Sequence, residues 1–142
     1  MSAEANKAVM RRFWEELFNQ QRFEVAEDII APDYTNHDLI PGETPGRAGL
    51  TQFVRLTHAM APDIRYAVED LLAEGDRVVT RWSAAGTQQG EFAGIPPTGR
   101  PFAITGIAIH RIAGGQVAEA WNNWDALGLM QQLGVVPQPQ RT

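Results

Sequence analysis

The chain has 142 residues, 44% of them hydrophobic, and a formal net charge of −5. This length fits one domain, and the apolar fraction is that of an ordinary globular protein rather than of a disordered or collagen-like chain. The sequence has no cysteine, which excludes disulfides, thiol nucleophiles and cysteine-based zinc sites. Because 12 Lys and Arg face 17 Asp and Glu, without a basic stretch, we expect no nucleic-acid partner.

The hydropathy of the chain bears on its location. No apolar run approaches the roughly 18 residues that a membrane span needs. The N-terminal sequence MSAEANK lacks the basic and apolar regions of a signal peptide. We therefore expect a cytoplasmic protein without a membrane partner.

The first part of the chain is dominated by helical periodicity. Apolar residues recur every three or four positions over residues 3–20, which predicts one amphipathic helix. A second, short helix is expected over 23–30, because Pro32 prevents its continuation. Residues 34–39 are expected to be extended, residues 41–46 to form a loop, and residues 50–60 to form a third helix that stops before Pro62.

After Pro62 the period changes to two, which is typical of strands. Strands are predicted over residues 64–69, 77–82, 101–112 and 117–124, with turns at Glu74–Asp76 and at Ala113–Gln116. Two adjacent prolines make residues 91–100 a loop. A last helix is expected over residues 126–133, with Gly134 at its C-terminal cap.

This order of elements predicts an α+β fold, in which N-terminal helices pack on a strongly curved, mainly antiparallel sheet. Such a sheet wrapped around a long helix leaves a conical cavity, a usual place for a small-molecule site. We expect one domain over residues 1–142, with residues 135–142 as a loosely held tail.

Familiar catalytic motifs are missing from the sequence. It has no phosphate-binding glycine loop, dinucleotide fingerprint, nucleophile elbow or His-Glu-x-x-His. Its histidines, His37, His58 and His110, lack ligand spacing. We therefore expect neither a metal nor a cofactor.

Asp125, which lies between the last strand and the last helix, allows two interpretations. As an N-cap, its carboxylate would accept the free amide hydrogens of the first helical turn. As a general acid/base, it would exchange protons with a substrate at the mouth of the cavity. The two conflict, because capping stabilises the ionised form and lowers the pKa, whereas acid/base work favours a raised pKa.

His110 and the cluster of Asn36, His37 and Asp38 are further candidates. His110 shares a strand face with Gly106 and Ala108, and this row of small residues predicts a wall that leaves room for a ligand. The alternative is a buried histidine with a structural role. Turn-region polar residues such as Asn36 and His37 are commonly structural, although they could also contact a substrate.

Aromatic residues at strand spacing could line the cavity or simply form the core. The candidates for contact with a substrate are Tyr66, Trp82, Phe92 and Trp121.

Several segments taken together resemble a known family. They are Trp14–Asn19, Ala31–Tyr34 with Asn36–Asp38, Glu74–Val79, Gly86–Thr87, Gly90–Phe92, Gly94–Arg100, Gly106–Ile112, Glu119–Trp121, Asp125 and Gln132–Gly134. Over residues 7–134 the chain is similar to the SnoaL-like polyketide cyclases, within the superfamily that resembles nuclear transport factor 2 (NTF2). One departure is Gln88, where many relatives have histidine after Gly-Thr.

The resemblance implies a cone-shaped NTF2-like (cystatin-like) fold and a homodimer formed through the outer face of the sheet, on which Ile107 and Ile109 would lie. It also implies intramolecular aldol condensation of a hydrophobic, aromatic polyketide without a cofactor. Asp125 would be the acid/base, His110 its supporting histidine, and Asn36 a polar contact. Fold similarity does not fix the activity. The alternatives are an isomerase or epoxide hydrolase on the same cone, and a small-molecule binder without catalytic activity.

Overall fold

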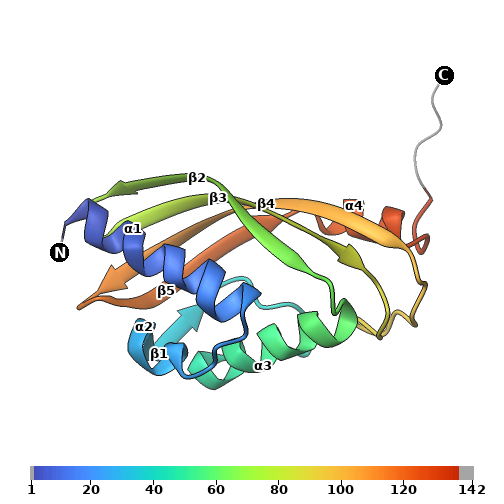
Figure 1. Ribbon diagram of the computed structural model, residues 1–142, viewed down its shortest axis with the longest axis horizontal. Helices are drawn as coiled ribbons and strands as arrows, with labels where there is room; N and C mark the ends of the chain where they lie inside the picture. The colour runs from blue at the N-terminus through green and yellow to red at the C-terminus, as the bar shows by residue number, and fades with distance from the viewer. Residues whose placement is uncertain (1, 138–142) are drawn as a thin grey trace.

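The computed structural model describes residues 2–137, and the helices that precede residue 61 lie on one side of a five-stranded sheet (Figure 1). The elements in chain order are α1 (Ala3–Arg12), the π-helix η1 (Phe13–Asn19), α2 (Val25–Ile29), β1 (Ile30–Asn36), α3 (Gly46–Met60), β2 (Arg65–Glu74), β3 (Arg77–Thr87), β4 (Pro101–Ala113), β5 (Gln116–Trp124) and α4 (Ala126–Gln132). The predicted α+β class is confirmed.

The N-terminal helix changes its winding halfway along. It begins after Ser2, whose side chain accepts a hydrogen bond from the Ala5 amide. The predicted helix over residues 3–20 corresponds to α1 followed by η1, a wider turn that a periodicity of 3.6 does not reveal. Asn19 ends η1 and pairs with the backbone of Tyr66 in β2, with one hydrogen bond to the amide and one to the carbonyl. This pair fixes the end of the helix to the sheet.

The strands are ordered β1-β5-β4-β3-β2, and all neighbours are antiparallel except β1 and β5, which are parallel. The extended segment predicted over residues 34–39 lies earlier than expected, at Ile30–Asn36. Its position is set by pairing with β5, a long-range contact that local sequence does not encode. The ladder is interrupted near Val68 in β2 and near Arg111 in β4, and such irregularities increase the twist of a sheet.

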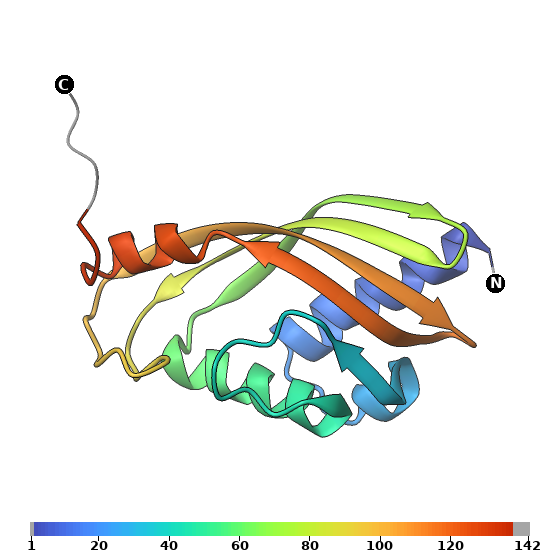
Figure 2. The same cartoon turned by 180° about the vertical axis from the view of Figure 1, so that it is seen from behind.

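One face of the sheet packs against α1, η1 and α3, while no helix within residues 2–137 covers the other face (Figure 2). Alternation along the strands separates the two faces. In β4, Ala108 and His110 point to the helices and are buried, whereas Ile107 points away and is 54% exposed. The predicted orientations of His110 and Ile107 are therefore confirmed.

Gly106 shows that the row of small residues on β4 does not leave space for a ligand along its whole length. A Cβ atom at Gly106 would overlap the indole ring of Trp82, its neighbour across the ladder. The space beside Gly106 is thus filled by the protein, and only Ala108 and His110 of this row face the cavity.

The predicted loop between β3 and β4 is organised by Gln88, which is fully buried. Its amide nitrogen donates to the carbonyls of Gly90 and Ile95, and its side-chain oxygen accepts from the amide and hydroxyl of Thr98. The side chain therefore ties together both ends of the loop that brings Phe92 into the core.

The segment that follows α4 begins with hydrogen bonds back to that helix. The amides of Val135 and Val136 both donate to the carbonyl of Met130, so the start of the expected loose tail is attached to α4. The rest of that tail, residues 138–142, lies outside the described residues. Within residues 2–137, none of the helices has the length and apolar character needed to cross a bilayer.

Candidate functional site

A cavity of about 100 Å³ lies between the inner face of the sheet and the helices η1 and α3. Ligand pockets commonly measure ~300–1,000 Å³, and a ~150 Å³ cavity holds benzene, so this volume corresponds to part of a ring system. Most of the lining residues are apolar or aromatic; they are Phe13, Trp14, Phe18, Ile40, Leu50, Phe53, Met60, Ile64, Tyr66, Trp82, Phe92, Phe102, Ile104, Ala108, Ala120, Trp124 and Leu129.

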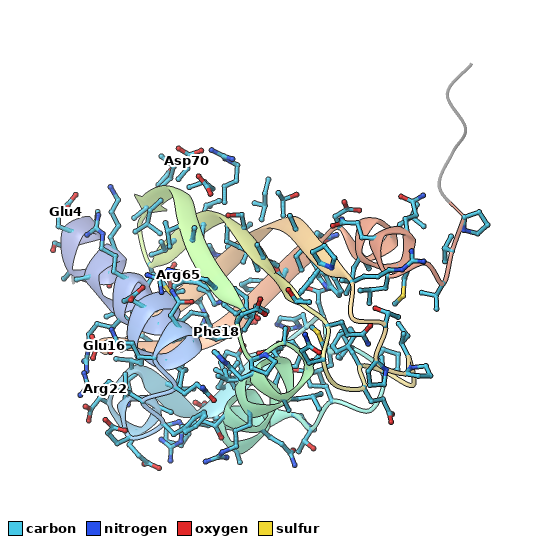
Figure 3. The ribbon with its side chains drawn as sticks, turned by 45° about the vertical axis from the view of Figure 1, so that its right-hand side comes forward. Glu4, Glu16, Phe18, Arg22, Arg65 and Asp70 are labelled. Carbon is cyan, nitrogen blue, oxygen red and sulfur yellow. The ribbon has the colours of Figure 1, made fainter. Side chains whose placement is uncertain are left out.

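The aromatic wall is built from η1 and the neighbouring strands. Trp14 and Trp82 are stacked with ring centroids 5.7 Å apart, and Phe18 meets Tyr66 edge-on at 5.1 Å. The turn of η1 separates inward from outward residues: Phe18 points to the interior, while Glu16 and Arg22 form an ion pair at the surface (Figure 3). The wall is therefore rigid and apolar, which suits the face of an unsaturated ring.

The indole groups of Trp14 and Trp82 also donate hydrogen bonds within the protein. Trp14 Nε1 donates to Thr80 Oγ1 at 3.4 Å, and Trp82 Nε1 donates to Asn122 Oδ1 at 3.1 Å. These bonds fix the ring planes, because they add directional constraints to the packing. A flat ligand would meet pre-oriented rings.

His110 lies at the floor of the cavity and is 3% exposed. Its ring is 4.9 Å from that of Phe13, and its Nδ1 has no hydrogen-bond partner in the described protein. Burial lowers the pKa of His110 from 6.5 to about 3, because the charged ring would be desolvated. A neutral imidazole can donate a hydrogen bond to a ligand from one ring nitrogen or accept one at the other, without carrying charge.

The other end of the cavity is polar. It is formed by Tyr34 and Asn36 from β1, Asp38 and Glu43 from the loop before α3, and Asn122 from β5. The Asp38 carboxylate accepts a hydrogen bond of 2.8 Å from the Asn122 amide, and its own amide donates to Asn36 Oδ1. These contacts attach the loop to β1 and to its neighbour β5, and they bring several polar groups together at one end of an apolar space.

Glu43 is the half-buried carboxylate of this polar end. Its Oε1 accepts a hydrogen bond of 3.0 Å from the amide of Ile40. Burial raises the pKa of Glu43 above the usual 4.5, and the hydrogen bonds from Ile40 and from the side chain of Asn36 oppose this shift. Burial, together with the nearby charge of Glu43, likewise raises the pKa of the Tyr34 hydroxyl. Tyr34 therefore stays a neutral hydrogen-bond donor.

Six of the residues selected from the sequence line the cavity; they are Asn36, Asp38, Tyr66, Trp82, Phe92 and His110. His37 and Trp121 do not belong to this lining. Alternation places Ala120 and Asn122 of β5 inward and Trp121 outward, where its ring stacks on that of His37 at 4.8 Å. His37 also contacts Glu119 at 2.7 Å. The prediction that His37 and Trp121 contact a substrate in the cavity is not supported by these positions.

Asp125 lies outside the cavity lining and is exposed. It is the N-cap of α4, with Oδ1 accepting a hydrogen bond of 2.8 Å from Gly128. The Asp125 amide donates to Thr105, five residues from His110 along β4 and thus roughly 17 Å away. The expectation that His110 lies near Asp125 is corrected by this register, and the position of Asp125 supports only the capping interpretation.

Glu43 and Asn122 were not selected from the sequence. Glu43 stands in a Pro-Gly loop, where acidic residues are ordinarily solvent-exposed, and no local pattern marks it. Asn122 could have been selected, since it shares a strand face with Ala120 opposite His110. Within residues 2–137, no group of three or more His, Asp or Glu side chains could hold a metal ion.

Comparison with known proteins adds to this geometry. The model of the SnoaL-like polyketide cyclase family matches residues 8–133. No curated protein sequence matches the chain.

Similar solved structures include TsrD from Streptomyces laurentii, which is 29% identical, with a TM-score of 0.87 and coverage of 96% of this chain and 99% of that one. IdmH from Streptomyces antibioticus, a proposed polyketide cyclase, is 35% identical over 91% of this chain and 98% of its own, with a TM-score of 0.77. AclR from Streptomyces galilaeus, a proposed hydroxylase, is 24% identical over 99% of this chain and 87% of its own, with a TM-score of 0.82, and shares the fold.

Proposed function

Since the chain belongs to the SnoaL-like polyketide cyclase family, we propose that it catalyses aldol-type intramolecular ring closure of a small hydrophobic carbonyl compound, without a cofactor. The main support is the division of the cavity into a wall of stacked aromatic rings and a polar end that contains a half-buried carboxylate. The wall would hold an unsaturated chain in a folded conformation. The polar end would manage the proton and the negative charge.

The chemistry needs no external oxidant or reductant. A carboxylate removes a proton from the carbon between two carbonyl groups, and the electron pair of the C–H bond forms an enolate. The enolate carbon attacks a ketone in the same molecule, a C–C bond forms, and the ketone oxygen becomes an alkoxide. The alkoxide takes a proton back from the carboxylic acid, so that the product is an isomer of the substrate.

Orientation is the main contribution expected of the protein. An intramolecular reaction gains most when the reacting carbons are held in contact, and rigid walls supply this constraint. His110, neutral and with an unpaired Nδ1, is suited to bind a carbonyl or hydroxyl group at the floor. A cavity of about 100 Å³ accommodates the reacting end only, so the rest of a larger substrate would extend through the mouth.

A synthetic aryl β-diketone with a pendant methyl ketone, placed to form a six-membered ring, tests this function. Liquid chromatography with mass detection should reveal an isomer of unchanged mass at a rate at least ~100-fold above buffer. Trp82→Ala, which removes one ring of the wall, should raise KM and lower kcat. Saturable binding without any acceleration would contradict the proposal. It would favour the second candidate, a small-molecule binder without catalytic activity, which the apolar wall of the cavity also suits.

We also propose that two copies associate through the bare face of the sheet, which is the face that no helix within residues 2–137 covers. Ile107 and Leu72 are exposed on this sheet. Because monomers commonly expose only small apolar patches, exposed apolar residues on a sheet face favour association. A two-fold arrangement would cover such a face on both copies at once.

A further inference from the structure

Building on the proposed function, we propose that Glu43 is the group that removes the substrate proton, and that the Tyr34 hydroxyl donates a hydrogen bond to the enolate oxygen that forms. The two residues come from adjoining parts of the chain, β1 and the loop that follows it, and both line the polar end of the cavity.

The carboxylate of Glu43 is held in place but not neutralised. The amide of Ile40 donates to Oε1, and the amide of Glu43 donates back to the Ile40 carbonyl at 3.0 Å, which closes a tight turn. Within residues 2–137, no Lys, Arg or His forms an ion pair with Glu43. A positioned carboxylate without a cationic partner retains its basicity, which a general base requires.

Tyr34 satisfies the second requirement. Its side chain is 5% exposed, and its hydroxyl is close enough to Glu43 for the charge of the carboxylate to disfavour ionisation. A neutral hydroxyl in a dry environment can donate a hydrogen bond to a developing oxyanion, and the low dielectric strengthens that bond. Donor and base would thus act on neighbouring atoms of one substrate, the carbonyl oxygen and the α-carbon.

The other carboxylates near the site are less suited to this role. Asp38 is exposed, and one of its oxygens already accepts from the Asn122 amide. Asp125 caps α4 outside the cavity. Glu43 alone among these three combines a place in the lining with burial that favours its protonated form between the two proton transfers.

Glu43 also lies where a substrate can reach it. Together with Ile40 and Phe53, it borders both the inner cavity and a groove of about 500 Å³ between the loop and α3. A substrate whose reacting end occupies the cavity would therefore pass the carboxylate as it extends outward. In the reaction, Glu43 takes the α-proton, Tyr34 holds the enolate oxygen, and Glu43 returns the proton to the alkoxide.

Proton exchange isolates this step from ring closure. The probe is 2-tetralone, a small aromatic ketone, incubated with the protein in D₂O while proton NMR follows the loss of its α-hydrogen signals. Wild-type protein should accelerate exchange above buffer. Glu43→Gln should lower the exchange rate at least ~100-fold. Tyr34→Phe should lower the exchange rate ~100-fold with little change in the affinity for 2-tetralone. Glu43→Asp, which keeps a shorter carboxylate, should retain part of the rate.

Glu91→Gln is the matched control, because Glu91 is exposed and lies outside the lining. Quenching of tryptophan fluorescence by 2-tetralone reports whether each variant still folds and binds. If the wild type cyclises the diketone while Glu43→Gln stays within about threefold in both assays, the role of Glu43 is overturned and the proposed function stands. If the wild type neither exchanges nor cyclises, both are overturned.

Discussion

Asp125 accepts a hydrogen bond of 2.8 Å from the amide of Gly128, three residues further along the chain. This bond satisfies one of the free amide groups at the start of α4. The structure thus places Asp125 as the N-cap of α4, outside the cavity lining.

This relationship predicts the behaviour of Asp125→Asn. Asparagine caps a helix about as well as aspartate, so the melting temperature should be nearly unchanged, and turnover of the aryl β-diketone should stay within about threefold of the wild type. Asp125→Ala should lower the stability by ~1 kcal/mol, measured by urea unfolding. A loss of turnover by orders of magnitude in a folded Asp125→Asn protein would instead make Asp125 the acid/base.

His110 predicts a dependence of stability on pH. Its pKa is lowered from 6.5 to about 3 by burial, so as the pH falls below 6.5 the unfolded chain takes up a proton that the folded protein does not. The contribution of neutral His110 to the free energy of unfolding is fully present above pH 6.5. It is lost progressively as the pH falls to about 3, by up to ~1.4 kcal/mol per pH unit. His110→Gln should show a shallower acid slope in urea unfolding at pH 7, 5.5 and 4.5. Equal slopes would contradict the prediction.

The bare face of the sheet predicts a dimer that a charge at Ile107 disrupts. Ile107→Lys should raise the dimer dissociation constant at least ~100-fold, because an ammonium group would be placed against apolar surface. Leu127→Lys is the control: Leu127 is similarly exposed but lies on α4. Light scattering at micromolar concentration measures both variants, and a monomeric wild type would count decisively against the dimer.

Gly106 predicts a steric effect on the aromatic wall. In Gly106→Ala the new methyl group would overlap the indole ring of Trp82, which would have to move and would lose its alignment with Asn122. We expect a loss of stability of ~1–3 kcal/mol together with weaker binding of 2-tetralone. Ala103→Gly exchanges the same two residue types on the outer face of the same strand, and it controls for the effect of glycine on the stability of the strand itself. Unchanged stability and affinity in Gly106→Ala would show that the wall adapts.

The sequence predicted the order of elements because helical and strand periodicities are local properties. The period of 3.6 in residues 3–20 and the alternation around His110 correctly identified which side chains face the core. The wider turn of η1 escaped this reasoning, since it keeps Phe13 and Phe18 buried much as a regular helix would. The start of β1 escaped it as well, because its parallel pairing with β5 joins segments more than eighty residues apart.

The sequence by itself determined the α+β class, the inward position of His110 and the aromatic character of the cavity, since each follows from residue type and period. Only the tertiary structure decided which polar groups meet there. Trp121 lies on the outer side of β5, where its ring stacks on that of His37. Asp125 caps α4 and is not part of the cavity lining, and the fold of a Pro-Gly loop places Glu43 near Tyr34. A site assembled from separate elements depends on long-range packing, and no local pattern records the distance between two side chains that only folding brings together.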